Sequence, residues 1–481
     1  MTDTTQDATN ETHGTGHETH GTGHETTSGT GPSRRSFLIG GSAALGTMAL
    51  PAAVAAPAEA APPARAGALR LTHGSVSGDV TASTAQVWLR GSGPGRARLV
   101  YGTDADRVRK GKDQHTGWQP LDADRDFTVQ FALEDLEPDT RYHYSVTLRD
   151  RGEPVQGPLA SFKTAPADDD ARDVLFTWGG DIGQGLRNPP PFPAFSAMLA
   201  QDPAFFIFNG DTIYADATTK VGGAATTLPQ YWAKYKENRE DGFFQALTSR
   251  VPLIVNWDDH EVANDFRGPE EPLMPIGRQA FHEYWPLSVG PERIYRSIRW
   301  GREVEVFVLD GRQYADPLGA PDGPDKSLLG VEQRDWLLDA VTRSTATWKI
   351  LVTSSPLSTL RSVQGPQDDY ASYEFELGLI LDAFRDAGVD NFVWLTADVH
   401  WGQAVEYPER GFWEFVGSPI GANPRAVSRP LSPTFGPQER FLRLNQRLYG
   451  SVFADAAAGS LTVRLHDEGG QEMYEVTLPG R

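Results

Sequence analysis

Four short segments of the chain place aspartates where an apolar run ends. They are Asp181 in "GGDIGQG", Asp211 in "NGDTIYAD", Asp258 and Asp259 in "NWDDHE", and Asp398 in "TADVH". A carboxylate is costly to remove from water, and several close together repel one another unless a cation neutralises them. Any one of these aspartates alone could instead cap a helix. The set, with His260 and His400 attached, favours a metal centre.

The types of side chain narrow the choice of metal. Carboxylates with at most two imidazoles suit hard or borderline cations such as Fe(III), Mn, Mg, Ca or Zn. Tyr214, three residues after Asp211, adds a phenol whose ionised form favours Fe(III). The chain has no cysteine, which excludes thiolate ligands, thiolate nucleophiles and disulfides.

The aspartates follow continuous apolar runs that are typical of strands buried on both faces. These runs are "DVLFTWGGD", "PAFFIFNGD", "VPLIVNWDD", "VEVFVLDGR", "WKILVTSSP" and "NFVWLTADVH". Helical patterns lie between several of them, for example "GVEQRDWLLDAVTRS" and "FELGLILDAFRDAG". The alternation predicts an α/β domain over residues 173–481, in which ligands collect at the carboxyl ends of the strands.

Residues 69–166 follow a different pattern, of short alternating strands and turns without a convincing helix. We expect a small β-sandwich there. Its segment "LEPDTRYHY" has the spacing of a tyrosine corner and so resembles a fibronectin type III-like domain. Tyr142 and His143 in this segment are expected to pack rather than to bind a ligand. "APADDDARD", residues 165–173, is a polar link to the second domain.

Residues 1–60 are expected to be an extension and a leader rather than part of either domain. "SRRSFLIGGSAALGTMALPAAVAAPAEA" looks like a twin-arginine export signal, with an uncharged stretch from Ser36 to Ala58. The alternative is a membrane helix, which the glycines, prolines and weakly apolar composition disfavour. Upstream, "HGTGHET" occurs twice in tandem, and we interpret it as a disordered, His-rich extension. The predicted location is therefore periplasmic, cell-wall-associated or extracellular.

Charge and missing motifs exclude several classes of function. The formal net charge of −20 disfavours binding to nucleic acid or anionic lipid, which depends on Lys and Arg. The chain has no glycine-rich phosphate loop, no G-x-S-x-G elbow and no H-E-x-x-H helix. Nucleotide-binding and serine-hydrolase hypotheses are therefore weakened.

The same segments resemble a known family. "NGDTIYAD" looks like G-D-x-I-Y, "NWDDHE" like W-D-D-H-E and "LTADVHWG" like L-T-G-D-V-H, motifs of the PhoD-like alkaline phosphatases and phosphodiesterases. "FVGSPI" and "THGSVSGDVTASTAQVWLR" also resemble segments of that family, which belongs to the calcineurin-like metallophosphoesterases. The resemblance extends from Leu69 to the C-terminus.

The resemblance implies a metallophosphoesterase with an α/β/β/α sandwich, preceded by a fibronectin-like domain. It implies Fe(III) beside one or more Ca(II), and it assigns roles by position. Asp211 would bridge two metals, Tyr214 would bind iron, and Asp398 and His400 would complete the cluster. Asp259 would be a ligand where related enzymes have asparagine, His260 would face the substrate, and Asn264 would be a less direct or calcium-side ligand. Asp258 and Glu261 would orient their neighbours.

The chain departs from the family pattern at two positions. Many members have a cysteine as an iron ligand in the first strand-end motif, and here Asp181 takes that place. Losing the thiolate weakens the preference for Fe(III) and leaves Mn or Zn open. The second departure is Ala397, where glycine is usual.

Two cations held at such a site would lower the pKa of a bound water and neutralise charge on the phosphoryl oxygens, which predicts hydrolysis of phosphate esters. His260 would stabilise the transition state or protonate the leaving alkoxide. Monoesters, diesters and a phospholipase D-like activity remain open, and loop residues 218–241 and 418–436 are expected to decide among them. Two other classes also remain, a metal-stabilised binding protein without turnover and a glycoside hydrolase. The second of these leaves Tyr214 and His400 unexplained.

Overall fold

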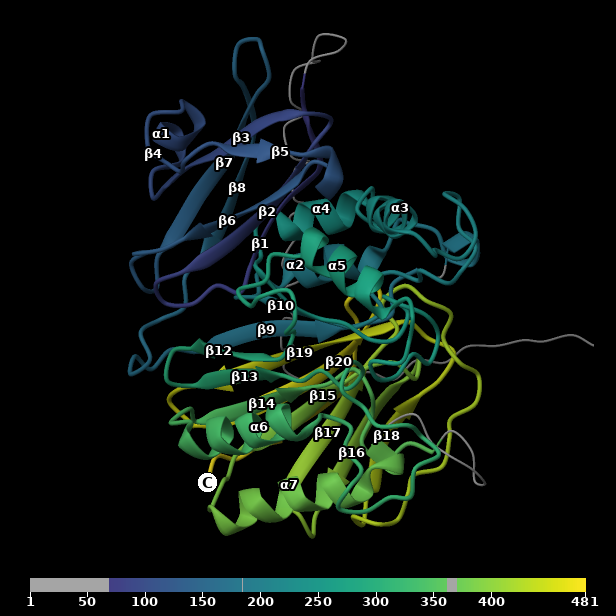
Figure 1. The fold of residues 1–481 in the computed structure, drawn as a ribbon. Coiled ribbons are helices and arrows are strands. Elements are labelled where there is room, and N and C mark those ends of the chain that lie inside the picture. The colour runs from purple at the N-terminus through teal and green to yellow at the C-terminus, as the bar shows by residue number, and fades with distance from the viewer. Residues whose placement is uncertain (1–68, 184, 361–369) are drawn as a thin grey trace, which may run out of the picture. The chain divides into compact units, whose positions relative to one another are not determined.

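The structure, a computed structural model, describes residues 69–183, 185–360 and 370–481. Within these ranges the chain forms three β-sheets with helices packed outside the two larger ones (Figure 1). The extension and export signal predicted for residues 1–60 lie outside the described residues. Among the residues that are described, no helix has the length and hydropathy needed to cross a bilayer.

The secondary structure is dominated by strands. The strands are β1 (Leu71–Gly78), β2 (Ala85–Gly91), β3 (Gly95–Gly102), β4 (Gln114–His115), β5 (Gln119–Leu121), β6 (Thr128–Leu133), β7 (Arg141–Arg149), β8 (Val155–Lys163), β9 (Val174–Gly179), β10 (Phe206–Asn209), β11 (Leu253–Asn256), β12 (Arg296–Trp300), β13 (Val304–Val308), β14 (Trp348–Val352), β15 (Phe392–Thr396), β16 (Gly402–Tyr407), β17 (Phe412–Gly417), β18 (Gln438–Arg443), β19 (Leu448–Asp455), β20 (Ser460–Asp467) and β21 (Glu472–Leu478). The helices are α1 (Ala105–Arg109), α2 (Pro193–Ala200), α3 (Leu228–Asn238), α4 (Gly242–Thr248), α5 (Met274–Tyr284), α6 (Val331–Arg343) and α7 (Glu374–Asp386).

Two large sheets carry the strands that precede the predicted site. One has the order β21-β20-β19-β9-β10-β11-β1-β2-β6, and the other has the order β12-β13-β14-β15-β17-β16-β18. The neighbours β9, β10 and β11 run parallel to one another, and so do β13, β14, β15 and β17. The carboxyl ends of the strands in each parallel set therefore lie at one edge of their sheet.

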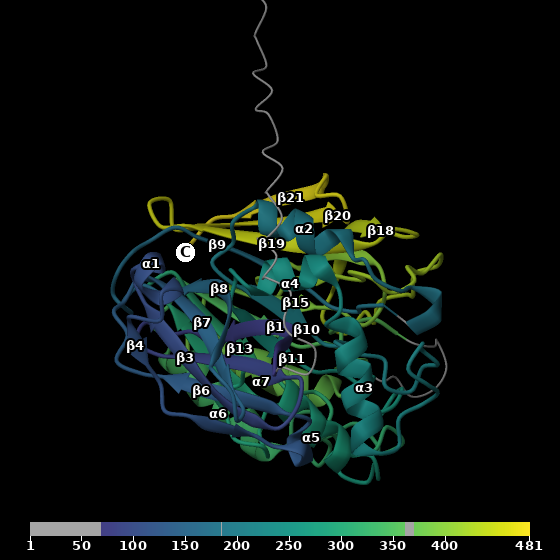
Figure 2. The same ribbon diagram turned by 90° about the horizontal axis from the view of Figure 1, so that it is seen from above.

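The two large sheets pack face to face. Alternate side chains of each strand point to opposite faces, so one set fills the core between the sheets and the other set packs against helices. Ile207 of β10 joins the core between the sheets, whereas Phe206 and Phe208 join the core formed with α2, α3, α4 and α5. In the other sheet Ile350 of β14 faces inward, and Leu351 packs with α6 and α7. Figures 1 and 2 show these two groups of helices on opposite outer faces. The predicted α/β/β/α sandwich is confirmed.

The first strands form two sheets rather than one. β1, β2 and β6 extend the nine-stranded sheet, because Gly78 of β1 pairs in parallel with Leu253 of β11. A side chain at Gly78 would lie 2.6 Å from Pro286 Cγ, so only glycine permits this approach. The third sheet consists of β3, β4, β5, β7 and β8.

The fibronectin type III-like assignment of residues 69–166 stays a prediction, and the expectation that this range has no helix is wrong in one place. There Asp104 caps the short helix α1 by accepting a hydrogen bond from the N–H of Asp106.

The "LEPDTRYHY" segment has the hydrogen bond expected of a tyrosine corner. The backbone N–H of Glu137 donates to the phenol oxygen of Tyr142 at 3.0 Å. The ring of Tyr142 is buried and stacks on Phe162, with 5.8 Å between the ring centroids. Tyr142 therefore has the packing role that the sequence predicted.

Residues 218–241, which we expected to be a loop, contain the helix α3. Pro229 lies in its first turn, where its missing N–H costs nothing, and the side chain of Gln230 accepts a hydrogen bond from the N–H of Thr227 at 3.0 Å. The same helix buries Tyr231 and Tyr235 against the core of the α2–α5 group. Tertiary burial together with this capping box explains why a polar segment is helical.

A buried ion pair fixes the end of β1 against the strand that leads to the predicted site. Arg296 of β12 donates two hydrogen bonds to the carboxylate of Asp79, each 2.7 Å long. The same guanidinium donates to the carbonyl of Val255 in β11 at 3.0 Å. Both charged side chains are buried, so each compensates the desolvation of the other.

Candidate metal centre

The predicted site residues lie in the loops that leave four parallel strands. Asp181 follows β9, Asp211 follows β10, Asp259 follows β11 and Asp398 follows β15. Since β9, β10 and β11 belong to one large sheet and β15 to the other, the site lies where the carboxyl ends of both sheets meet. The two-layer fold therefore brings together residues more than 200 positions apart.

Three overlapping groups of acids and histidines have one ligand atom from each member within 4.8 Å of the others. The groups are Asp181, Asp211 and His400; Asp211, Asp259 and His260; and Asp258, Asp259 and Asp398. Asp211 belongs to the first two groups, and Asp259 belongs to the last two. This sharing is the arrangement that adjacent cations require of bridging carboxylates.

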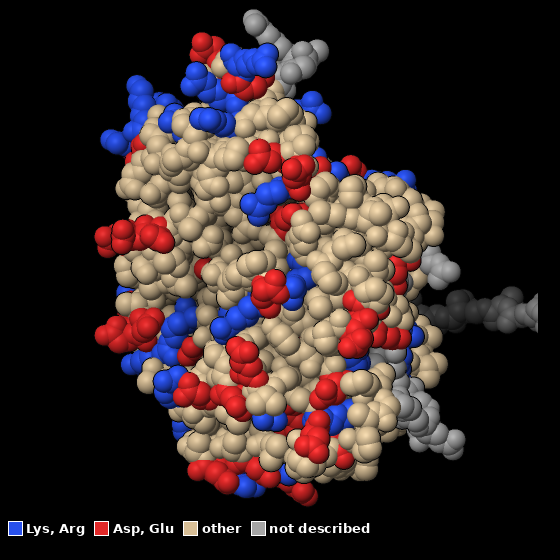
Figure 3. Space-filling model, in the orientation of Figure 1, with Lys and Arg blue, Asp and Glu red and all other residues tan. Residues whose placement is uncertain are grey.

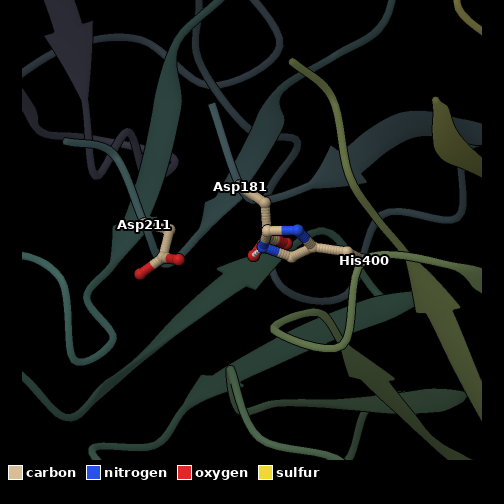
Figure 4. A group of neighbouring side chains, drawn as sticks. All are labelled: Asp181, Asp211 and His400. Carbon is tan, nitrogen blue, oxygen red and sulfur yellow. Dashed lines mark ion pairs between the residues drawn. The ribbon is translucent and has the colours of Figure 1, made fainter. Parts of the chain in front are cut away.

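Asp181 is held in place from two directions. Its Oδ2 accepts hydrogen bonds from the hydroxyl of Ser418 and from the N–H of Asp398, the latter at 3.2 Å. Its Oδ1 lies 3.1 Å from Nε2 of His400 (Figure 4). Nδ1 of His400 lies 2.8 Å from the carbonyl oxygen of Asn423, which fixes the ring so that Nε2 faces the acids.

Tyr214 lies between the two histidines of the centre. Its hydroxyl is 3.0 Å from Nε2 of His400, and its ring centroid is 4.3 Å from that of His260. Burial, followed by the charges of Asp211 and Asp181, raises the pKa of Tyr214 well above its usual value. A phenolate at this position therefore needs a cation beside it.

Four residues of the groups have left-handed backbone conformations. The φ angles of Asp181, Asp211, Asp398 and His400 are 59°, 49°, 64° and 61°. This region costs an L-residue about 1–2 kcal/mol, although aspartate tolerates it better than most. Such conformations persist only where the surrounding structure holds them, and they cluster at functional sites.

Two carboxylates of the centre, those of Asp211 and Asp258, are buried close to other acids, and their pKa values are raised. Burial and then the charges of Asp259 and Asp181 raise the pKa of Asp211 well above its usual value. Burial raises the pKa of Asp258 to about 6, although Arg312 opposes the shift. The Oδ2 atom of Asp258 is buried and has no hydrogen-bond partner among the described residues. Carboxylates, two imidazoles and a phenol thus form a donor set that fits hard or borderline cations.

His260 is oriented by a residue that the sequence analysis did not identify. Its Nδ1 lies 2.7 Å from Oδ1 of Asp216. Burial alone would lower the pKa of His260, but Asp259 and the bond to Asp216 outweigh it and raise the pKa to about 9. Asp216 is the last residue of the "NGDTIYAD" segment. The sequence signal that could have identified it is a second aspartate five positions after Asp211.

Arg312 is the second residue that the sequence analysis missed. Its guanidinium is fully buried, and its Nε donates to Oδ1 of Asp258 at 2.5 Å. Nη2 lies 4.0 Å from Oδ1 of Asp398. Arg312 follows the end of β13 and is the last residue of the "VEVFVLDGR" segment. Nothing in that segment indicates that the fold places this arginine beside Asp258.

Glu261 and Asn264 lie at the edges of the centre. Glu261 accepts hydrogen bonds from the N–H of Thr212 at 2.5 Å and from the N–H of Asp258 at 2.8 Å. It therefore braces the loops after β10 and β11, which agrees with an orienting role. Asn264 is exposed, and its side-chain amide donates to Asp265 at 2.6 Å. Its assignment as a ligand stays a prediction.

The model of the PhoD-like phosphatase family matches residues 183–465, and that of the PhoD-like phosphatase N-terminal domain matches residues 55–166. Alkaline phosphatase D of Bacillus subtilis (strain 168) is 26% identical over 379 residues. These residues cover 68% of this chain and 64% of that protein, so the match spans less than two thirds of the relative's length.

Two solved structures share the fold over most of the chain. The structure of PhoD matches with a TM-score of 0.70 and 20% identity, covering 85% of this chain and 88% of that one. Purple acid phosphatase PPD1 from seeds of yellow lupin (Lupinus luteus) matches with a TM-score of 0.61 and 13% identity. That match covers 85% of this chain and 74% of the lupin chain.

Proposed function

Because the chain belongs to the PhoD-like phosphatase family, we propose that the protein is a metal-dependent hydrolase of phosphoric esters. One observation carries the proposal, namely the sharing of Asp211 and Asp259 among three overlapping groups of potential ligands. A single structural cation needs one group, whereas hydrolysis of a phosphate ester benefits from adjacent cations.

The residues divide into those that would hold metal and those that would act on the substrate. Asp181, Asp211, Tyr214 and His400 would hold one ion, which we propose is Fe(III), with Mn or Zn as alternatives. Asp211 would also contact a second ion, proposed as Ca(II), together with Asp259 and Asp398. Bound metal would supply a nucleophile at neutral pH and neutralise charge on the phosphoryl oxygens.

His260 would act on the leaving group. Asp216 holds its Nδ1, so the ring cannot rotate freely and Nε2 is the atom left for the substrate. The same carboxylate stabilises the protonated imidazole. From this position His260 would donate a proton to the departing alkoxide oxygen, which is general acid catalysis.

The acidic surface of the protein gives phosphate no general attraction. On the face in Figure 3, acidic side chains are interspersed with basic ones over the part of the chain that the structure describes. The net negative charge of the protein therefore does not attract the substrate. Bound metal would instead make the local electrostatic field positive at the centre. This supports recognition of a phosphate-ester small molecule rather than of nucleic acid.

We propose that residues 218–241 and 418–436 decide between monoesters and diesters. Both segments adjoin the centre, since the N–H of Ala225 donates to the carbonyl of Ala215 at 2.8 Å and the N–H of Arg425 donates to that of His400 at 2.9 Å. Turnover of nitrophenyl phosphate compared with bis-nitrophenyl phosphate would measure the preference. Faster turnover of the bis-ester would favour the phosphodiesterase or phospholipase D-like alternative.

We propose further that the twin-arginine pathway exports the protein to the periplasm, the cell wall or the medium. The adjacent Arg34 and Arg35 before an uncharged stretch support this. Replacing both with lysine keeps the expected charge but removes the signal's paired arginines. Cell fractionation would then find the variant in the cytoplasm, and unchanged export would refute the proposal.

Asp211→Asn tests the proposed activity. The amide removes the shared negative charge, and we expect at least about a 100-fold loss of kcat on nitrophenyl phosphate together with lower metal content by elemental analysis. Asp113→Asn serves as the matched control, because Asp113 is a half-buried acid in the turn directly before β4, outside the centre. Full activity of Asp211→Asn would show that the reaction does not need the shared carboxylate.

A further inference from the structure

An asparagine ends each of the two strands that lead to the shared carboxylates. Asn209 is the last residue of β10 and Asn256 is the last residue of β11, and the two lie directly opposite each other in the parallel ladder. Both side chains are fully buried. Asp211 follows Asn209 by two positions, and Asp259 follows Asn256 by three, so each amide comes just before a potential metal ligand.

The side-chain amides of both asparagines face the opposite sheet. Side chains two residues apart on a strand share a face, and Ile207 of β10 and Ile254 of β11 belong to the core between the two large sheets. Asn209 and Asn256 therefore continue two inward-facing apolar rows with polar groups. A buried amide without hydrogen bonds is costly, so its partners have to come from within the fold.

The partners of Asn209 belong to the second large sheet. Its Nδ2 donates to the carbonyl of Thr353 at 2.9 Å and to that of Leu395 at 3.2 Å. Thr353 directly follows β14, and Leu395 lies in β15, three residues before Asp398. One side chain of the nine-stranded sheet thus binds the ends of two neighbouring strands of the other sheet.

Asn256 completes the connection between the sheets. Its Nδ2 donates to Oδ1 of Asn209 at 3.3 Å and to the carbonyl of Leu309, which directly follows β13, at 3.0 Å. The two amides therefore join β10 and β11 to the ends of β13, β14 and β15. Apolar contacts between sheets have no preferred direction, whereas hydrogen bonds to particular carbonyls fix one sheet relative to the other.

We propose that Asn209 and Asn256 are positioning residues that set the spacing of the two sheets at the metal centre before any ion binds. The proposal rests on the proposed function, because it concerns the same centre. Asp211 and Asp259 come from one sheet and Asp398 comes from the other, so these ligands reach a common ion only at one spacing of the sheets. The asparagines act by holding the strand ends, with their amides bound to the protein's own carbonyls.

Asn209→Leu tests the proposal, because leucine is similar in size but can neither donate nor accept a hydrogen bond. The probe is Co²⁺, added to protein whose metal a chelator has removed. We expect the dissociation constant for Co²⁺ to rise at least about 10-fold, and the visible absorption spectrum of bound Co²⁺ to change, since the ligands are then differently spaced.

Ile207→Ala is the matched control for a general loss of stability. It removes buried atoms from the same face of the same strand, so it lowers the stability of the fold while leaving both amides in place. We expect this variant to keep the wild-type affinity for Co²⁺ and the wild-type spectrum. A role of Asn209 in stability alone would make the two variants alike.

Hydrogen exchange of the wild type gives a second arm that needs no folded variant. The backbone N–H groups of Gly210 and Thr353 donate to carbonyls of neighbouring strands at the strand ends. If the asparagines set the spacing, these N–H groups stay protected from exchange after a chelator removes the metal. Loss of their protection in the metal-free protein would show that metal holds the strand ends, and would overturn the proposal.

Two results with the variants would also overturn it. One is wild-type affinity and spectrum in folded Asn209→Leu, and the other is an equal loss of affinity in Ile207→Ala. Failure of the proposed function looks different. Wild-type protein that binds metal but does not hydrolyse nitrophenyl phosphate would remove the proposed function and leave the positioning role of the asparagines standing.

Discussion

Asp211 and Asp259 each belong to two of the acidic groups, so these two carboxylates couple the ligands of the whole centre. Asp211 also has a left-handed backbone, which the loops around it must hold. His260, by contrast, depends on a partner outside the groups, because Asp216 binds its Nδ1. The proposed chemistry therefore rests, at residue scale, on carboxylates that would share metal and on a histidine that is held in one orientation.

Asp216→Asn should separate the orientation of His260 from the binding of metal. We expect kcat to fall about 10–100-fold with little change in KM or in metal content, because the amide no longer stabilises the protonated imidazole. Steady-state kinetics with elemental analysis would measure both quantities. Asp113→Asn should match the wild type, and an unchanged kcat in Asp216→Asn would show that His260 does not need this partner.

Most of the centre could be anticipated because its aspartates and histidines come directly after apolar strands. The structure brings Asp181, Asp211, Asp259, Asp398 and His400 together as that pattern predicted. Asp216 and Arg312 could not be assigned in the same way. Their contacts span 44 and 54 positions along the chain, and only the folded loops determine which side chain each one meets.

At the scale of elements, the loops after β10 and β11 form one unit. The carboxylate of Glu261 accepts hydrogen bonds from the backbone of both loops. Gly210, which has a φ of 82°, lets the loops approach closely because it has no side chain. A side chain added at Gly210 would lie 2.7 Å from Cβ of Asp258 and 3.0 Å from Cβ of Ser354. Close packing of these loops thus sets the distance between the potential metal ligands that they carry.

Gly210→Ala should both destabilise the fold and weaken metal binding. We expect the free energy of unfolding to fall by at least about 1–2 kcal/mol from the left-handed backbone alone. Chemical denaturation and metal analysis would measure the two effects. Gly242→Ala is the control, because an added Cβ there contacts nothing within 4 Å. Equal stability of the two variants would contradict the account of these loops.

The elements that the sequence predicts best are those with strong local patterns. The apolar strands are present as expected, and the two quoted helical patterns form α6 and α7. α3 was missed because its sequence is rich in polar residues and its helix depends on a capping box and on buried tyrosines. The pairing of β1 with β11 could not be predicted from local sequence either, because it joins Gly78 to Leu253, which lies far along the chain.

Across the whole described molecule, buried charges tie the first strands to the helices around the centre. Asp126 pairs with Arg90 of β2 at 2.9 Å and with Lys236 of α3 at 2.9 Å, and it accepts a hydrogen bond from Tyr284 of α5. Burial opposes ionisation of Asp126, but these partners outweigh it and hold its pKa below 3.8. The N-terminal strands thus contribute to stability through electrostatics as well as packing.

Asp126→Asn should change how stability depends on pH. A lowered pKa in the folded state stabilises the protein above pH 3.8, and this stabilisation is lost as the pH falls through the folded-state value. We therefore expect the variant to be less stable than the wild type at neutral pH, with the difference shrinking on acidification. Unfolding by urea at several pH values would measure it, with Asp124→Asn as a control for an exposed acid of the same turn. A difference independent of pH would refute the assignment.

The central claim is that the shared carboxylates hold metal that is required for hydrolysis of phosphate esters. The most direct test is the rate of nitrophenyl phosphate hydrolysis by the full chain after removal of metal with a chelator and stepwise return of calcium and iron, manganese or zinc. The account predicts that activity disappears with the metal and returns in proportion to the ions bound. Undiminished hydrolysis by folded protein that elemental analysis shows to be free of metal would contradict it.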